Sequence, residues 1–215
     1  MVTHPLPAAP RGRHAPPLQV RQDRQRQRLF SAAASVFARS GYADASAEAI
    51  AREAGMSKAT FYEHFDNKED CIVALFDAAV GVLDGAMRAA GEAQAAADLG
   101  TRVQATVRAF LKVLADFPDE SQTLLVEIVG AGPRAMERRD AALDRIASAI
   151  DGYNATDAER GAARRFASFD DAFAIVGAVV ELASRHLRKR RTEDIRELEP
   201  VIERVALGLA APQPG

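Results

Sequence analysis

The sequence predicts an all-α protein, in which an N-terminal three-helix helix-turn-helix head precedes a larger helical body, with about nine helices in all. Three observations support this prediction. The chain of 215 residues is 48% hydrophobic but only 6% aromatic, and its alanine-rich composition favours helices. Apolar residues recur at the spacing of helix faces, and no convincing run alternates as a strand would. Residues 41–68 contain two short helical segments separated by a tight turn.

The N-terminal tail is predicted to be disordered over residues 1–20, because it contains five of the ten prolines and few core-forming side chains. A basic run extends from Arg11 to Arg28. It has two interpretations, a solvated tail or an arm that lies along DNA phosphates or in the minor groove. The neighbouring motif favours the arm, with Arg24 and Arg28 as candidate contacts.

A first helix is predicted over residues 24–39, because apolar side chains from Phe30 to Phe37 recur at i, i+3, i+4 and i+7. Gly41 ends it, and Tyr42 is expected to pack back on the head.

Two shorter helices are predicted over residues 47–54 and 58–64, with Gly55 in the turn between them. Ser46 and Ser57 precede these helices as N-caps, whose hydroxyl groups accept a backbone N–H of the first turn. In a helix-turn-helix the second helix enters a DNA major groove.

The outward side of that second helix is predicted to contact DNA. Lys58 and Thr60 are expected to reach base edges, because the small Ala59 between them permits close approach. Phe61 and Phe65 are expected to face the core. The candidate DNA-binding residues are Arg24, Arg28, Ser46, Ser57, Lys58, Ala59, Thr60, Tyr62, His64 and Lys68.

This part of the chain, over residues 28–76, resembles the DNA-binding domain of the TetR family of bacterial transcriptional repressors. It departs from the family at Ala59, where glycine is frequent, and at Ala49, where an acid is frequent. The resemblance implies that Tyr62 and His64 contact the DNA backbone. It rests on the following residues: Ile50-Ala51, the run from Ala54 to Tyr62, His64-Phe65 and Lys68-Glu69.

The domain boundary is predicted between a helix-turn-helix domain over residues 21–67 and a ligand-binding and dimerisation domain over residues 68–212. A helix that begins at Lys68 after an Asn67 cap joins the two. Any movement of the body must therefore reach the DNA-binding domain through this helix, as a conformational switch requires. Lys68 is also a candidate phosphate contact near the start of this helix. Further helices or apolar segments are predicted over residues 101–117, 123–129 and 133–150.

Two long helices are predicted at the end of the chain, one over residues 157–191 and one from a Thr192 cap to Leu209, with Pro200 as a kink or restart. The first is apolar on more than one side, so a second copy of the chain is expected to cover it. The TetR resemblance implies the same, because family members dimerise through their last two helices. The candidate interface residues are Val176, Val179, Val180, Ile202, Val205 and Leu209.

The net charge of -2 conceals an asymmetry. Residues 1–65 hold nine Lys/Arg and five Asp/Glu, and the remaining residues hold 19 and 25. The basic end therefore carries the motif, as expected for a DNA-contacting head on an acidic body.

The sequence contains no catalytic constellation, metal-ligand spacing or cofactor motif, so neither an enzyme nor a cofactor is predicted. The single cysteine, Cys71, allows no intramolecular disulfide. No apolar run is long enough to span a membrane and no secretion signal is present, which predicts a cytoplasmic protein.

An effector site is predicted inside the body, lined largely by apolar side chains. Glu127 and Asp170 stand in apolar surroundings, and each has two interpretations, orienting a ligand in a pocket or pointing to solvent. The candidate ligand-binding residues are Phe110, Leu114, Glu127, Phe169, Asp170 and Phe173.

Together these patterns predict a homodimeric repressor that binds a palindromic double-stranded DNA operator and is released by a small, largely apolar effector. Two alternatives remain open. One is a DNA-binding regulator without a small-molecule effector, and the other is a helical enzyme or carrier in which the motif is incidental.

Overall fold

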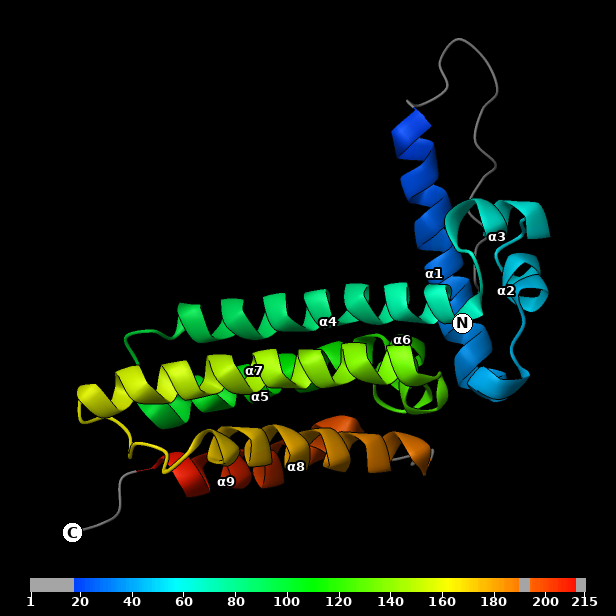
Figure 1. Cartoon of the computed structure of the whole chain (residues 1–215). Helices are drawn as coiled ribbons and strands as arrows, with labels where there is room; N and C mark the ends of the chain where they lie inside the picture. The colour runs from blue at the N-terminus through cyan, green and yellow to red at the C-terminus, as the bar shows by residue number, and fades with distance from the viewer. Residues whose placement is uncertain (1–17, 190–193, 212–215) are drawn as a thin grey trace.

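The computed structural model describes residues 18–189 and 194–211. This part of the chain folds into nine α-helices and two short 3-10 helices without a strand, as predicted. Figure 1 shows a head of three helices standing at one end of a body of long, roughly parallel helices. We use "head" for residues 18–67 and "body" for the described residues from 68 onward.

The head consists of α1 (Leu18–Asp44), α2 (Ala47–Glu53) and α3 (Lys58–His64). Gly41 has a φ of 78° inside the last turns of α1, so the regular helix ends there, as predicted. The start of α1 differs from the prediction. Residues 18–20, assigned to the disordered tail, form its first turn, whereas residues 1–17 lie outside the described residues.

The body begins with the long helix α4 (Lys68–Ala93), which Asn67 caps by accepting the N–H of Asp70 at 2.9 Å. The remaining elements are α5 (Leu99–Asp116), α6 (Pro118–Leu125), η1 (Glu127–Gly130), α7 (Pro133–Glu159), α8 (Phe169–Arg188), η2 (Ile195–Leu198) and α9 (Glu199–Ala210). α4 packs against α5 and α7, and α8 and α9 lie on the opposite side of these two helices (Figure 1).

The prediction of one helix over residues 157–191 is wrong. α7 continues to Glu159, a loop with Gly161 at φ 71° follows, and α8 begins after the Ser168 N-cap. Buried Asn154 holds this loop, because its amide donates to the Arg164 carbonyl at 2.8 Å and accepts the Phe166 N–H at 2.9 Å. The break thus depends on a side chain from the preceding helix.

The C-terminal helix also begins later than predicted. The proposed Thr192 cap lies outside the described residues. Asp194 caps η2 by accepting the N–H of Arg196 at 2.9 Å, and Pro200 then stands in the first turn of α9. Pro200 therefore restarts a helix, one of the two outcomes expected for it.

One hydrophobic core extends from the head into the body. Fully buried Phe37 and Phe61 of the head belong to the same cluster as Ile72 of α4 and Ile128 of η1. A smaller cluster around Ala147, Phe166 and Val176 lies farther along the body. Because close-packed interiors transmit displacement, the head is mechanically continuous with the body.

Candidate nucleic-acid interface

The outward face of α3 presents a cation that the protein does not neutralise. Lys58 is exposed and has no hydrogen-bond or ion-pair partner among the described residues, and the neighbouring Ala59 is also exposed. Tyr62, one turn further along, is 48% exposed. An unpaired lysine beside a small residue and an exposed aromatic hydroxyl suits contact with phosphates and base edges.

Both short helices begin at the predicted serine caps. The Ser46 hydroxyl accepts the N–H of Ala49 at 3.1 Å, and the Ser57 hydroxyl accepts the N–H of Thr60 at 3.0 Å. The Thr60 hydroxyl lies 3.0 Å from that of Ser57. The first turn of α3 is therefore ordered before any partner arrives, which lowers the entropic cost of binding.

Aromatic packing fixes α3 on the head. The Phe61 ring lies 5.4 Å from that of Phe65, which in turn lies 5.8 Å from Phe30, measured between ring centroids. The guanidinium of Arg26 lies over Phe30 and Phe65, at 5.1 and 5.0 Å from their centroids. Phe61 and Phe65 thus face the core, as expected, and Arg26 is part of this packing.

Two arginines of the basic run have different roles. Arg24 is exposed and without a partner among the described residues, so it remains a candidate phosphate contact. Arg28 instead donates from Nη2 to the Ala54 carbonyl at 2.7 Å, at the C-terminus of α2. This hydrogen bond ties α1 to the turn of the motif, and we revise the prediction for Arg28 to a structural role.

The prediction that Lys68 contacts phosphate is also revised. Its ammonium donates to the carbonyls of Tyr42, Ala43 and Ala45 at 2.8, 3.0 and 3.1 Å, and lies 4.4 Å from the centroid of the Tyr42 ring. These three bonds use all the N–H donors of a lysine. Lys68 therefore binds the α1–α2 turn.

His64 is half-buried at the end of α3. Its Nε2 is buried and has no hydrogen-bond partner in the structure, while its ring lies 6.3 Å from that of Phe65. The imidazole is therefore held mainly by packing, and its contact with DNA stays a prediction.

The six candidate ligand-binding residues lie in three different environments, and the ligand site stays a prediction. Phe110 and Leu114 are buried in α5. Phe169 and Phe173 are 41% and 40% exposed at the start of α8, beside exposed Asp170. Glu127 lies next to the head, where it accepts the N–H of Tyr42 at 2.9 Å. Glu127 was expected either to orient a ligand or to point to solvent. In the structure it instead binds the backbone of the head.

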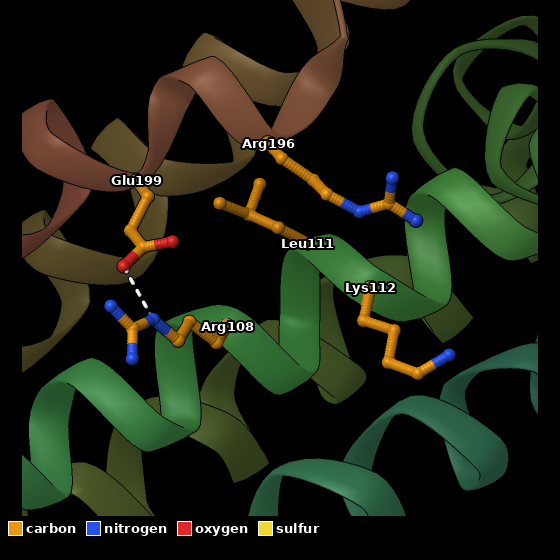
Figure 2. A pocket seen from close by; sticks show the side chains of 5 residues that line it. All are labelled: Arg108, Leu111, Lys112, Arg196 and Glu199. Carbon is orange, nitrogen blue, oxygen red and sulfur yellow. Dashed lines mark hydrogen bonds and ion pairs between the residues drawn. The ribbon is translucent and has the colours of Figure 1, made fainter.

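A pocket of about 400 Å³ lies instead between α5 and the η2–α9 segment, and no sequence pattern indicated it. Figure 2 shows its lining residues Arg108, Leu111, Lys112, Arg196 and Glu199. Each of its cations has a carboxylate partner. Arg108 donates to Glu199 at 2.6 Å, Arg196 to Asp194 at 3.0 Å, and Lys112 to Asp116.

The predicted dimer residues divide into two groups. Val176 and Ile202 are buried inside the protomer, at 5% and 1% exposure, which corrects their assignment to an interface. Val179, Val180, Val205 and Leu209 are half-buried. The free sides of the two helices expose Phe173 and Ala174 on α8 and Gly208 on α9.

The described residues hold no group of three or more His, Cys, Asp or Glu that could bind a metal ion. Burial raises the pKa of the Cys71 thiol to about 12, so it is not a thiolate at neutral pH. No described helix is both long and apolar enough to cross a membrane.

Comparison with known proteins agrees with the geometry of the motif. Residues 29–75 match the family described as bacterial regulatory proteins, tetR family. No protein with a curated description matches the chain significantly.

Several solved structures share the fold over nearly their whole length. The fatty acid degradation regulator FadR from Bacillus halodurans superposes with a TM-score of 0.78 at 22% identity, over 86% of this chain and 95% of that one. The transcriptional regulator FadR from Bacillus subtilis, in complex with stearoyl-CoA, gives 0.74 at 18%, over 84% and 96%.

The TetR family transcriptional regulator PfmR from Thermus thermophilus gives a TM-score of 0.67 at 22% identity, over 88% of this chain and 98% of that one. All three are transcription or fatty acid degradation regulators. Residues 29–75 thus match the N-terminal helix-turn-helix domain of the tetR family, and the described chain has the all-α fold of these solved regulators.

Proposed function

We propose that this protein is a homodimeric repressor that binds a roughly palindromic operator and leaves it when a small, largely apolar effector binds the body. The exposed, unpaired Lys58 on a pre-ordered α3 is the observation that carries the DNA-binding part. Lys58 stands on the outward face of the second helix of the motif, so its unpaired ammonium is available to an anionic partner at the place where a helix-turn-helix meets DNA.

Within the head we assign base contact to Lys58 and Thr60, and backbone contact to Arg24, Tyr62 and His64. Ser46 and Ser57 act as caps whose hydroxyl groups lie at the DNA-facing ends of their helices. Lys68 is left out of the contacts because its three N–H donors bind backbone carbonyls, and Arg28 is assigned a structural role because its Nη2 binds the Ala54 carbonyl.

The proposed dimer pairs α8 and α9 with the same helices of a second copy. Exposed Phe173 and Ala174, with half-buried Val180 and Val205, supply an apolar surface on this side of the body. A two-fold axis between the copies would place two α3 helices in successive major grooves, roughly 34–36 Å apart.

The effector proposal rests on the bound ligand of one structural neighbour. The Bacillus subtilis FadR structure contains stearoyl-CoA, whose acyl chain is a long apolar group. We therefore use a long-chain acyl thioester as the first probe for this chain. Release requires only that the probe bind more tightly to a conformation with wrongly spaced heads.

DNA binding is tested with fragments selected from genomic DNA by the purified protein. Lys58→Ala is expected to weaken binding about tenfold or more and to reduce the salt dependence by roughly one counterion. Lys112→Ala removes a lysine from the body and serves as the matched control, with an unchanged affinity. Loss of affinity in both variants, or in neither, would contradict the assignment of Lys58.

Effector release is tested on the same protein–DNA complex by adding stearoyl-CoA, with coenzyme A and stearate as separate arms. We expect stearoyl-CoA to dissociate the complex and to raise the melting temperature of the free protein. A regulator without a small-molecule effector would bind DNA and show neither response. That alternative is favoured by the paired cations of the α5–α9 pocket and by the dispersal of the predicted ligand residues.

A further inference from the structure

The α1–α2 turn, residues 41–45, is held from two sides by the body. On one side Glu127 of η1 accepts the Tyr42 N–H through Oε2 at 2.9 Å. On the other side Lys68 of α4 donates to three carbonyls of the turn and lies over the Tyr42 ring. The segment that leads into the helix-turn-helix is therefore bound by a carboxylate and an ammonium from two different body elements.

Glu127 is itself oriented. Its second oxygen, Oε1, accepts the side-chain amide of Gln122 in α6 at 3.1 Å. A carboxylate that accepts from a backbone N–H and from a neutral amide needs no cation beside it to stay in place. The contact with Tyr42 is thus a positioned hydrogen bond between elements 85 residues apart in the sequence.

The backbone conformation at Gly41 allows the Tyr42 N–H to reach the Glu127 carboxylate. Its φ of 78° disfavours any residue with a side chain, and a Cβ there would lie 3.6 Å from Oε2 of Glu127. The turn brings the following N–H directly to the carboxylate. Phe37 packs on the ring of Tyr42 at 5.7 Å, which anchors the same residue to α1.

The elements around Glu127 also reach the rest of the body. The Ser121 hydroxyl in α6 donates to the Leu114 carbonyl of α5 at 3.2 Å, and the Ser184 hydroxyl of α8 donates to the Leu125 carbonyl at 3.1 Å. Both bonds are buried, so a shift of α5 or α8 displaces the end of α6. Glu127 stands two residues after Leu125, so a displacement of the end of α6 also moves Glu127.

We propose that Glu127 is a positioning residue that fixes the angle of the head on the body through the Tyr42 N–H, and that it transmits changes in the body to the helix-turn-helix. Lys68 provides the second attachment and keeps the turn on α4. The regulatory meaning of this contact rests on the proposed function, whereas the contact itself can be tested without DNA.

The first test is amide hydrogen exchange, read by mass spectrometry on peptides that contain Tyr42. Glu127→Ala is expected to increase exchange in residues 41–46 about tenfold, because the amide loses its acceptor. Glu127→Gln should restore protection, since a glutamine carbonyl can accept this N–H and the Gln122 amide can turn to satisfy the other group. Glu137→Ala, which removes an exposed acid of α7, is the matched control.

The second test compares DNA carrying two half-sites with DNA carrying one. A head with a variable angle must lose that freedom to engage two half-sites at fixed spacing. Glu127→Ala is therefore expected to weaken binding to the full operator about tenfold and to leave binding to a single half-site within twofold of the wild type. Glu127→Gln and Glu137→Ala should match the wild type on both.

The outcomes separate the two proposals. Unchanged exchange at residues 41–46 in Glu127→Ala would overturn the positioning role, and so would an equal loss on full and half operators, which would indicate a damaged head. Failure of Glu127→Gln to restore protection would also overturn it. If the wild-type protein binds no DNA, the proposed function fails, while the exchange measurement still decides whether Glu127 holds the turn.

Discussion

The head and the body use their charged side chains differently. In the head, Lys58 and Arg24 remain exposed without a partner among the described residues. In the body, several arginines are paired across elements, as in Arg102–Asp157 and Arg138–Asp77 at 2.5 and 2.6 Å, while Arg160, Arg185, Lys189 and Arg204 are exposed without a side-chain partner among the described residues. Unpaired cations provide affinity for a polyanion, whereas paired ones hold helices in register.

The two regions also differ in how they are packed. Four buried phenylalanines, Phe30, Phe37, Phe61 and Phe65, fill the small head. The much longer body has long helices with buried alanines, such as Ala135, Ala142 and Ala183, at their contacts. A head stabilised by a few large side chains is sensitive to single changes, while contributions in the body are spread over many contacts.

The largest expected effect tests this difference in packing. Phe61→Ala should lower the free energy of unfolding by about 3–5 kcal/mol, because it empties the centre of the head core. Phe173→Ala in α8, where the ring is 40% exposed, should cost less than about 0.5 kcal/mol in the isolated protomer. Urea denaturation at several protein concentrations measures both. A large, concentration-dependent loss in Phe173→Ala would show that a second copy covers this ring.

A smaller effect is expected at the ion pair between α5 and α7. Arg102 and Asp157 have side chains only 18% and 12% exposed, so Asp157→Ala leaves a nearly buried guanidinium without its partner. We expect a loss of about 3 kcal/mol. Glu92→Ala breaks the exposed Arg88–Glu92 pair and is the control, with a loss below about 0.5 kcal/mol. Similar losses in the two variants would contradict the structural role assigned to the body's buried charge.

The smallest effect concerns the pH dependence of the cap of α5. The N–H and hydroxyl of Thr101 hold the pKa of Asp98 below its ordinary value of 3.8. The folded state therefore binds a proton at Asp98 less readily than the unfolded state does. The contribution of ionised Asp98 to the free energy of unfolding is complete at pH values above 3.8 and is lost as the pH falls through the pKa of Asp98 in the folded state. Asp98→Asn keeps a capping oxygen and should match the wild type near neutral pH.

The measurement for Asp98 is the melting temperature of both proteins between pH 6 and pH 3. The asparagine variant is expected to lose less stability over the acid limb of this range, since one titrating carboxylate has been removed. Superimposable acid limbs would indicate that the Thr101 contacts do not influence the titration of Asp98 in solution.

Much of the head could be predicted because its signals are local. Ser46, Ser57 and Asn67 cap their helices through N–H groups three residues away, and Gly55 adopts a φ of 65° in the turn. These contacts depend on neighbours in the chain, so residue type and spacing are sufficient to predict them. The all-α class and the order of most helices follow from the same periodicity.

The body was predicted less well where its boundaries depend on distant residues. The break between α7 and α8 is held by Asn154, and a repeating apolar pattern does not show it. The ligand prediction includes Phe169 and Phe173 as apolar lining residues of a site inside the body. Both rings are exposed on α8. Apolar character thus indicates that a side chain can be buried, but the packing of the helices decides whether it is buried.

The sequence by itself determined that this chain is helical, where its DNA-facing helix begins, and which end carries the excess of positive charge. Only the tertiary structure decided the roles of the charged residues around the motif. Arg28 and Lys68 bind carbonyls 26 residues away, and Glu127 binds the backbone of Tyr42 across 85 residues. A charged side chain binds whichever group the fold brings within about 3 Å, and no local pattern encodes a partner at such separation. The turn that joins the head to the body is therefore visible in the sequence only as a glycine followed by a tyrosine, and becomes a mechanical connection in the folded protein.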